Sequence, residues 1–324
     1  MFWIGSISFL LLIPSLWGAA QLDWKEHEAE VLAQAAHDHQ PIVAAFLGNK
    51  FCPWSEKLVD DVLSVEAFQQ KIEEHAILWK VGLDQENSEE QLKLRKKYRV
   101  EECPSILLLD PMGNEFARFG YLPEDASEYA ARLVQIIADF QEICVAFDQQ
   151  DKTINAKRWK ELYVKAGQLS VPIFQQEIIE RGIQVDKKCY FLTEKYAQLL
   201  KSHKLKNKEV KAFRQQLLKS DPDNRYGTQF KVAMLEFYKR TAIPKKPCEK
   251  VIRPLVDYLA RFGKKDRENA WKAEWTIAQY LHTKNAEQKA LEYAARAHEK
   301  APAPMKDHIA EIMDTMRSEN ADGL

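Results

Sequence analysis

An uninterrupted apolar run, Ile42 to Leu47, constrains the fold of this chain more than any other segment. A strand that is apolar at every position is buried on both faces, as the strands of parallel sheets are. A second apolar run covers 76–83, and the residues between the two runs, 53–74, carry apolar side chains at helical spacing. The order strand, helix, strand predicts two parallel strands joined by a right-handed crossover, and therefore an α/β domain.

Further elements of this domain can be predicted from caps and turns. Ser88 followed by Gln91 is typical of a capping box at the start of a helix. The turn residues 110–114 separate two short apolar runs and predict an antiparallel hairpin. The remaining predicted elements are helices over 23–37 and 88–98, strands over 105–109 and 115–119, and a helix that begins at Pro123.

From about Asn155 onward the pattern predicts helices only, separated by turn residues. Within 271–304 the small residues Ala278, Ala290 and Ala297 have the spacing of a tetratricopeptide helix pair, where small side chains let two helices approach closely. A single unit of this kind fits. We therefore expect the second half to be all-helical and repeat-like.

The charge of the chain changes sign between the two halves. Residues 21–145 contain 12 Lys and Arg against 24 Asp and Glu, whereas the residues after them contain 35 against 24. We therefore predict an α/β domain over 21–146 and an all-helical domain over 147–324, with opposite charges that favour their docking. The Lys and Arg of the second half alternate with Glu and Asp along helical patterns, which predicts a solvated helical surface and no nucleic-acid partner.

The first residues, 1–20, have the composition of a signal peptide. An apolar stretch from Ile7 to Trp17 is followed by small residues that end at Ala20, although no basic residue precedes it. We therefore expect a periplasmic or secreted protein that is cleaved near Ala20. An uncleaved membrane anchor is the alternative, since a span needs about 20 apolar residues.

The chemistry of the chain is expected at Cys52-Pro53-Trp54-Ser55, between the first buried strand and the helix that follows it. Backbone N–H groups at a helix start favour a thiolate over a thiol. Pro53 suits the first helical position because it has no N–H. Ser55 lies on the same helix face as Cys52, where its hydroxyl could donate to the sulfur. A thiolate attacks disulfides, so this position suits thiol–disulfide exchange.

With these features, residues 23–145 resemble thioredoxin-fold domains of the subgroup found in periplasmic disulfide-handling proteins. The resemblance implies that Cys52 is the attacking cysteine and Pro104 the cis-proline, which shapes the substrate-facing loop. It also implies that Pro53 and Trp54 contact substrate, although Trp54 is equally suited to packing. No cofactor is implied. The resemblance rests on the motifs at 42–47, 52–55, 81–84, 102–106, 110–113 and 119–123.

The family has a second cysteine where this chain has Ser55. Without that cysteine, a mixed disulfide between Cys52 and substrate cannot be released by the usual intramolecular attack. Isomerisation, or monothiol exchange with an external small thiol, needs only one enzyme thiolate. The resemblance also places the cis-proline loop opposite Cys52. Cys103 could therefore supply a second thiol, or it could simply fill space behind the proline.

Three further cysteines, Cys144, Cys189 and Cys248, lie in helical patterns. They are expected to be core residues or to include a structural pair, and the total of five leaves at least one thiol unpaired. No His or Cys lies at metal-ligand spacing beside Cys52 or Cys103, so no metal is expected.

We therefore predict an exported thiol–disulfide oxidoreductase or disulfide isomerase that acts through Cys52. Its expected partners are exported client proteins with cysteines and a membrane-bound or small-thiol redox partner. The helical half would bind the client or partner protein. The alternative is a non-catalytic adaptor, in which a degenerate thioredoxin fold and the helical half both bind proteins and Cys52 is unreactive.

Overall fold

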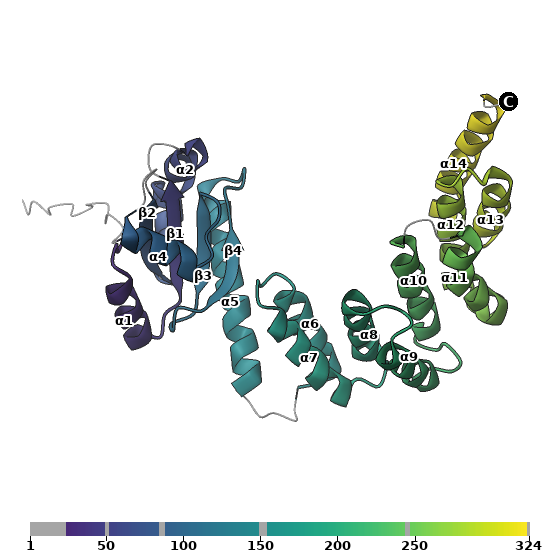
Figure 1. Cartoon of the computed structure of the whole chain (residues 1–324), viewed down its shortest axis with the longest axis horizontal. Coiled ribbons are helices and arrows are strands. Elements are labelled where there is room, and N and C mark those ends of the chain that lie inside the picture. Colours follow the sequence, from purple (N-terminus) through teal and green to yellow (C-terminus); the bar gives the residue numbers. More distant parts are fainter. Residues whose placement is uncertain (1–23, 49–51, 84–87, 149–153, 244–246, 323–324) are drawn as a thin grey trace, which may run out of the picture. The chain divides into compact units, whose positions relative to one another are not determined.

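A computed structural model describes residues 24–48, 52–83, 88–148, 154–243 and 247–322 (Figure 1). These residues form two compact units. The first contains the chain up to Asp148 together with Lys165–Val171, and the second contains Gln149–Val164 and the chain from Pro172 onward. The expected signal segment, residues 1–20, lies outside the described residues. Among the residues that are described, no helix is both long and apolar enough to cross a bilayer.

The first unit is built around a four-stranded sheet with the order β2-β1-β3-β4 (Figure 1). Strand β1 (Ile42–Gly48) pairs parallel with β2 (Ile77–Leu83) and antiparallel with β3 (Ser105–Leu109). Strand β3 pairs antiparallel with β4 (Glu115–Phe119). Every residue of β1 and β3 is buried, because these two strands lie inside the sheet. The predicted α/β topology is confirmed.

Helices pack on both faces of this sheet. Alternate residues of a strand point to opposite faces, and Phe46 of β1 packs in one cluster with Val31 of α1 (Glu28–Asp38) and Leu94 of α4 (Glu89–Lys97). On the other face α3 (Glu66–Ile72) and α5 (Ala126–Asp148) pack together, with the rings of Phe68 and Tyr129 6.5 Å apart. The capping box that begins α4 is present as predicted.

Three predicted helices have different limits in the structure, and one of them, α5, begins at Ala126 and not at Pro123. The helix expected over 53–74 divides into α2 (Pro53–Leu58), a π-helix η1 (Val59–Leu63) and α3. An uninterrupted helix would place Phe68 about 120° around the helix from Val62, although both side chains are fully buried. Helix α1 begins at Glu28 rather than near residue 23, because Lys25 forms a bridge with Trp79 at the edge of the sheet.

The segment Lys165–Val171 belongs to the first unit although the chain on either side of it belongs to the second. The Ser170 N–H donates to the carbonyl of Phe116 in β4, at 2.8 Å. The Lys165 ammonium lies 2.6 Å from Asp139 and 2.7 Å from Glu142, both on α5. Asp139 is only 4% exposed, so Lys165 supplies the charge that this buried carboxylate needs.

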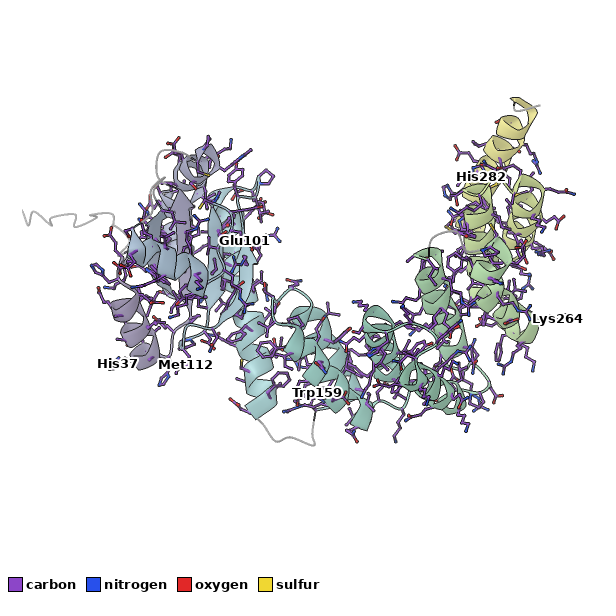
Figure 2. All side chains as sticks on the ribbon, viewed as in Figure 1. His37, Glu101, Met112, Trp159, Lys264 and His282 are labelled. Atoms are coloured by element: carbon purple, nitrogen blue, oxygen red, sulfur yellow. The ribbon has the colours of Figure 1, made fainter. Side chains whose placement is uncertain are left out.

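Among the described residues, the second unit consists of helices without strands, and the predicted fold class, an α/β domain followed by an all-helical part, is confirmed. Ala278, Ala290 and Ala297 are fully buried where α12 packs against α13. His282, labelled in Figure 2, ends α12 and lies 2.9 Å from Glu287 of α13. The helices are α6 (Ala156–Ala166), α7 (Pro172–Val185), α8 (Tyr190–Ser202), α9 (Lys208–Ser220), α10 (Thr228–Thr241), α11 (Cys248–Phe262), α12 (Arg267–His282), α13 (Glu287–Lys300) and α14 (Ala303–Asp322).

Candidate active site

Cys52 is the N-cap residue of α2. Its carbonyl accepts the N–H groups of Ser55 and Glu56, at 2.9 and 3.3 Å, and so begins the helix. Pro53 occupies the first helical turn, where its missing N–H leaves nothing unpaired. Helix geometry leaves the N–H of Trp54 without an intrahelical partner. The half-buried Cys52 side chain therefore lies at the positive end of a helix.

The cis-proline loop meets Cys52 directly. The Cys103–Pro104 peptide bond is cis, and the Cys52 Sγ lies 3.2 Å from the carbonyl oxygen of Cys103. A protonated thiol donates to this carbonyl, whereas a thiolate has no proton to donate and is repelled by the oxygen. Ionisation of Cys52 therefore breaks this contact and leaves the Cys103 carbonyl free to accept another donor.

The Cys103 side chain has a different environment from its carbonyl. It is half-buried and packs against the core cluster beneath α1 and α4. Burial raises the pKa of the Cys103 thiol, and the nearby Arg95 guanidinium only partly opposes this effect. Cys103 is therefore a protonated thiol at neutral pH. No disulfide joins it to Cys52, since both thiols are free.

Ser55 is buried in the first turn of α2, with 2% of its surface exposed. Its Oγ accepts the backbone N–H of Gly48, the last residue of β1, at 2.9 Å. This hydrogen bond joins the end of the strand to the start of the helix that carries Cys52. Within the described part of the chain, no hydrogen bond links Ser55 to the Cys52 sulfur, so the expected donation stays a prediction.

A surface pocket of about 570 Å³ is lined by Cys103, whose carbonyl contacts the Cys52 sulfur, and by Trp54, two residues after Cys52. Trp54 and Lys57 of α2 form one wall, and the opposite wall comes from the cis-proline loop and from the segment after β4. Trp54 is 57% exposed, so it does not pack in the core. Its ring instead lies 5.5 Å from the ring of Tyr121. The full lining is Trp54, Lys57, Glu102, Cys103, Pro104, Gly120, Tyr121 and Pro123.

Hydrogen bonds fix the loop that leads into the cis-proline. The Arg118 guanidinium donates to the carbonyls of Tyr98 and Arg99, at 2.6 and 3.0 Å. The Ser105 hydroxyl donates to the carbonyl of Glu102, at 2.7 Å. Glu101, labelled in Figure 2, lies in this loop. The carbonyl that faces Cys52 therefore has a defined position before any substrate binds.

The structure thus brings together Cys52, Ser55, Cys103 and Pro104, with Trp54 at the surface of the same site. Sequence reasoning gave no role to Tyr121, whose ring lies beside Trp54 and whose hydroxyl donates to Asp61 at 3.2 Å. The available signal was an aromatic residue two positions after the last strand.

The other cysteines lie outside this site. Cys144, Cys189 and Cys248 are all free, so the structural pair considered for them is not formed. Cys189 is buried at the start of α8 and lies 3.4 Å from the Ser220 hydroxyl. Across the described residues, no group of three or more His, Cys, Asp and Glu side chains is arranged to hold a metal ion.

The chain is similar in sequence to thioredoxin-like and disulfide-handling proteins. Residues 29–136 match the family model described as a thioredoxin-like domain. Thioredoxin-related protein DsbJ of Chlamydia pneumoniae is 26% identical over 333 aligned positions, which cover 98% of this chain and 95% of that protein. Disulfide bond reductase DsbH of the same organism is 31% identical over 121 positions, covering 36% of this chain and 72% of its own length. A solved DsbH oxidoreductase structure is 29% identical, with a TM-score of 0.35, and covers 40% of this chain and 93% of that one.

Proposed function

This chain belongs to the thioredoxin-like family, and we propose that it carries out thiol–disulfide exchange through the single thiol of Cys52, as a disulfide isomerase or a monothiol exchanger. The names of its two relatives support thiol–disulfide redox chemistry. One observation carries the proposal for Cys52. Its half-buried sulfur lies at the start of α2, 3.2 Å from the carbonyl of the cis-proline loop and beside an open pocket.

The reaction needs one enzyme sulfur. The Cys52 thiolate attacks one sulfur of a substrate disulfide, so that the substrate S–S bond breaks and a bond between Cys52 and that sulfur forms. The departing substrate sulfur takes up a proton. Another thiol of the substrate then attacks the mixed disulfide, which forms a rearranged disulfide and releases Cys52. Nothing is oxidised or reduced overall, which agrees with Ser55 at the position of the family's second cysteine.

Pro53, Trp54 and Pro104 have positioning roles in this proposal. Pro104 and Trp54 line the pocket beside the nucleophile, where an extended substrate segment would lie. Ionisation of Cys52 frees the carbonyl of Cys103, which then accepts a backbone N–H of that segment. Pro53 fixes the start of the helix and leaves its N-terminal end open to the substrate sulfur.

A resolving role for Cys103 is a second candidate, favoured by the contact between its carbonyl and the Cys52 sulfur. In that reaction the Cys103 thiolate attacks Cys52 in the mixed disulfide, releases the substrate as a thiol and leaves a Cys52–Cys103 disulfide. The substrate is reduced, and an external dithiol must then reduce the enzyme. The raised pKa of Cys103 disfavours this route at neutral pH.

The test is reactivation of scrambled ribonuclease in a glutathione buffer, with mass spectrometry of iodoacetamide-labelled native protein in parallel. Wild-type protein should accelerate reactivation, and Cys52 should be labelled faster than Cys103. Cys52→Ser should lose the acceleration, whereas Cys248→Ser, a matched control in the other unit, should keep it. Retained acceleration in Cys52→Ser would contradict the role of Cys52 and assign the activity to another thiol. Absence of acceleration by the wild-type protein, together with a Cys52 that labels no faster than Cys103, would favour the non-catalytic adaptor.

The expected clients are exported proteins that contain cysteines, with a membrane-bound or small-thiol redox partner. The apolar segment before residue 21 supports a periplasmic or secreted location. Fractionation of cells that express the full chain tests this location, with a form that lacks residues 1–20 as the control. Retention of the full chain in the cytoplasm would contradict export.

A further inference from the structure

The second unit contains a small pocket that has no part in the proposed thiol chemistry. It has a volume of about 140 Å³ and lies between α9, α10 and α11. Each of the three helices contributes one arginine to it: Arg214, Arg240 and Arg261 respectively. Lys264, labelled in Figure 2, lies two residues after the end of α11 and marks this part of the chain.

The positive charge of this pocket is only partly balanced. Its one buried carboxylate, Glu236, accepts the Tyr196 hydroxyl at 3.0 Å and pairs with Arg214 and Arg240. The other acid of the lining, Asp257, pairs with Arg253 outside the pocket, at 2.8 Å.

Arg261 is the arginine of this pocket that remains without a counter-ion. Among the described residues it has no acidic partner, and its guanidinium lies 5.0 Å from the ring of Phe262. The lining therefore has three arginines and a single carboxylate that pairs within the pocket, Glu236, which Arg214 and Arg240 share. A negatively charged ligand would balance the positive charge of Arg261.

The position of Arg240 follows from a proline inside α11. Pro254 has no N–H, so the carbonyl of Lys250, four residues earlier, lacks its usual helical donor. The Arg240 Nη1 donates to this carbonyl, at 2.9 Å. The Arg240 Nε is buried and has no hydrogen-bond partner among the described residues. A buried donor without a partner is uncommon in native structures and costs free energy until it receives an acceptor.

We propose that this pocket binds an acidic side chain of a polypeptide partner. Planar guanidinium groups match the two oxygens of a carboxylate. The volume suits one side chain, and the apolar walls formed by Leu218, Pro254 and Phe262 suit its methylene groups. The helical unit thus recognises partners through acidic residues, and this binding does not depend on the thiol chemistry of Cys52.

The test measures fluorescence anisotropy of a short fluorescein-labelled peptide of alternating Glu and Gly, titrated with the full chain, beside a peptide with Gln in place of Glu. The Glu peptide should bind about tenfold more tightly, the usual effect of one charge-assisted hydrogen bond. Arg261→Gln should remove this preference. Arg267→Gln, which neutralises an exposed arginine outside the pocket, should keep it.

Two results would overturn the inference. Equal binding of the Glu and Gln peptides would show that the pocket does not recognise a carboxylate. If Arg261→Gln and Arg267→Gln lost equal affinity for the Glu peptide, the peptide would be attracted by the overall positive charge of the unit and not by the pocket. A thermal melt must show that Arg261→Gln folds as wild type does. Cys52→Ser should bind the Glu peptide normally, so failure of the thiol proposal and failure of this one can be told apart.

Discussion

Ser55 occupies the position of the family's second cysteine, and its hydroxyl joins β1 to α2. Replacing it with Ala leaves the buried Gly48 N–H without an acceptor. We expect Ser55→Ala to lower the free energy of unfolding by about 1–3 kcal/mol, measured by urea denaturation. Ser202→Ala removes an exposed hydroxyl from α8 and should change the free energy of unfolding little. An unchanged stability in Ser55→Ala would mean that this hydrogen bond contributes nothing.

A second substitution at residue 55 tests whether the missing cysteine alone prevents dithiol reduction. Ser55→Cys restores the family's pair of cysteines, so an intramolecular attack can release substrate from Cys52. We expect this variant to reduce insulin with dithiothreitol at least about tenfold faster than wild type. Cys52→Ser combined with Ser55→Cys should show no gain. Failure of Ser55→Cys to accelerate the reaction would indicate that the geometry around α2 prevents the second attack.

The pKa of Cys103 gives a prediction with a definite sign. Burial raises this pKa in the native state, so alkylation of native Cys103 should begin at a higher pH than alkylation of the same residue in urea. Because the folded state holds the proton more tightly, the contribution of Cys103 to stability should fall as pH rises through its native pKa. Labelling rates against pH in both states check this, and coincident profiles would contradict it.

At the residue scale, a motif in the sequence was sufficient to place Cys52 at the start of α2 and to predict the cis peptide bond before Pro104. Tyr121 was missed, because an aromatic residue after a strand does not by itself show that its ring will lie beside Trp54. That contact depends on where α2 and the segment after β4 meet in space. The environment of Cys103 was equally inaccessible, since its carbonyl faces Cys52 while its side chain packs into the core.

At the element scale, Pro254 interrupts the hydrogen bonding of α11 and thereby provides Arg240 with an acceptor. Pro254→Ala restores the helical donor to Lys250, so the free energy of unfolding should rise by about 1 kcal/mol. The Glu peptide should bind more weakly, because the Lys250 carbonyl no longer holds Arg240. Urea denaturation and anisotropy measure the two effects. Tighter peptide binding in this variant would contradict the positioning role of Pro254.

Elements with strong local signals were predicted closely, and those that depend on packing were not. The capping box of α4 satisfies its backbone donors within one turn, so Ser88 and Gln91 were enough to locate it. The break between η1 and α3 is different, because it exists to bury both Val62 and Phe68. The sequence predicted one continuous helix over 53–74, because the packing that buries both side chains is not visible in their spacing.

At the scale of the whole molecule, the similarity to DsbJ covers 98% of this chain and therefore extends over both units. The helical unit is thus part of the sequence that aligns with that relative. Cys52 and the arginine pocket lie in different units, one for each proposed activity. Cys52→Ser and Arg261→Gln should then each remove one activity and leave the other intact, and their effects should be additive in the double variant.

The first unit includes a segment that lies beyond residue 146. Charge patterning suggested a boundary at 146, whereas contacts assign Lys165–Val171 to the same unit as the sheet. A fragment of residues 21–146 leaves the buried Asp139 without the Lys165 ammonium and Phe116 without the Ser170 N–H. A fragment of residues 21–171 should therefore unfold at a higher urea concentration than the shorter fragment. Its free energy of unfolding should be greater by about 2–4 kcal/mol. Lys165→Met in the longer fragment should remove much of this gain. Equal stability of the two fragments would show that the sheet and its helices do not need the returning segment.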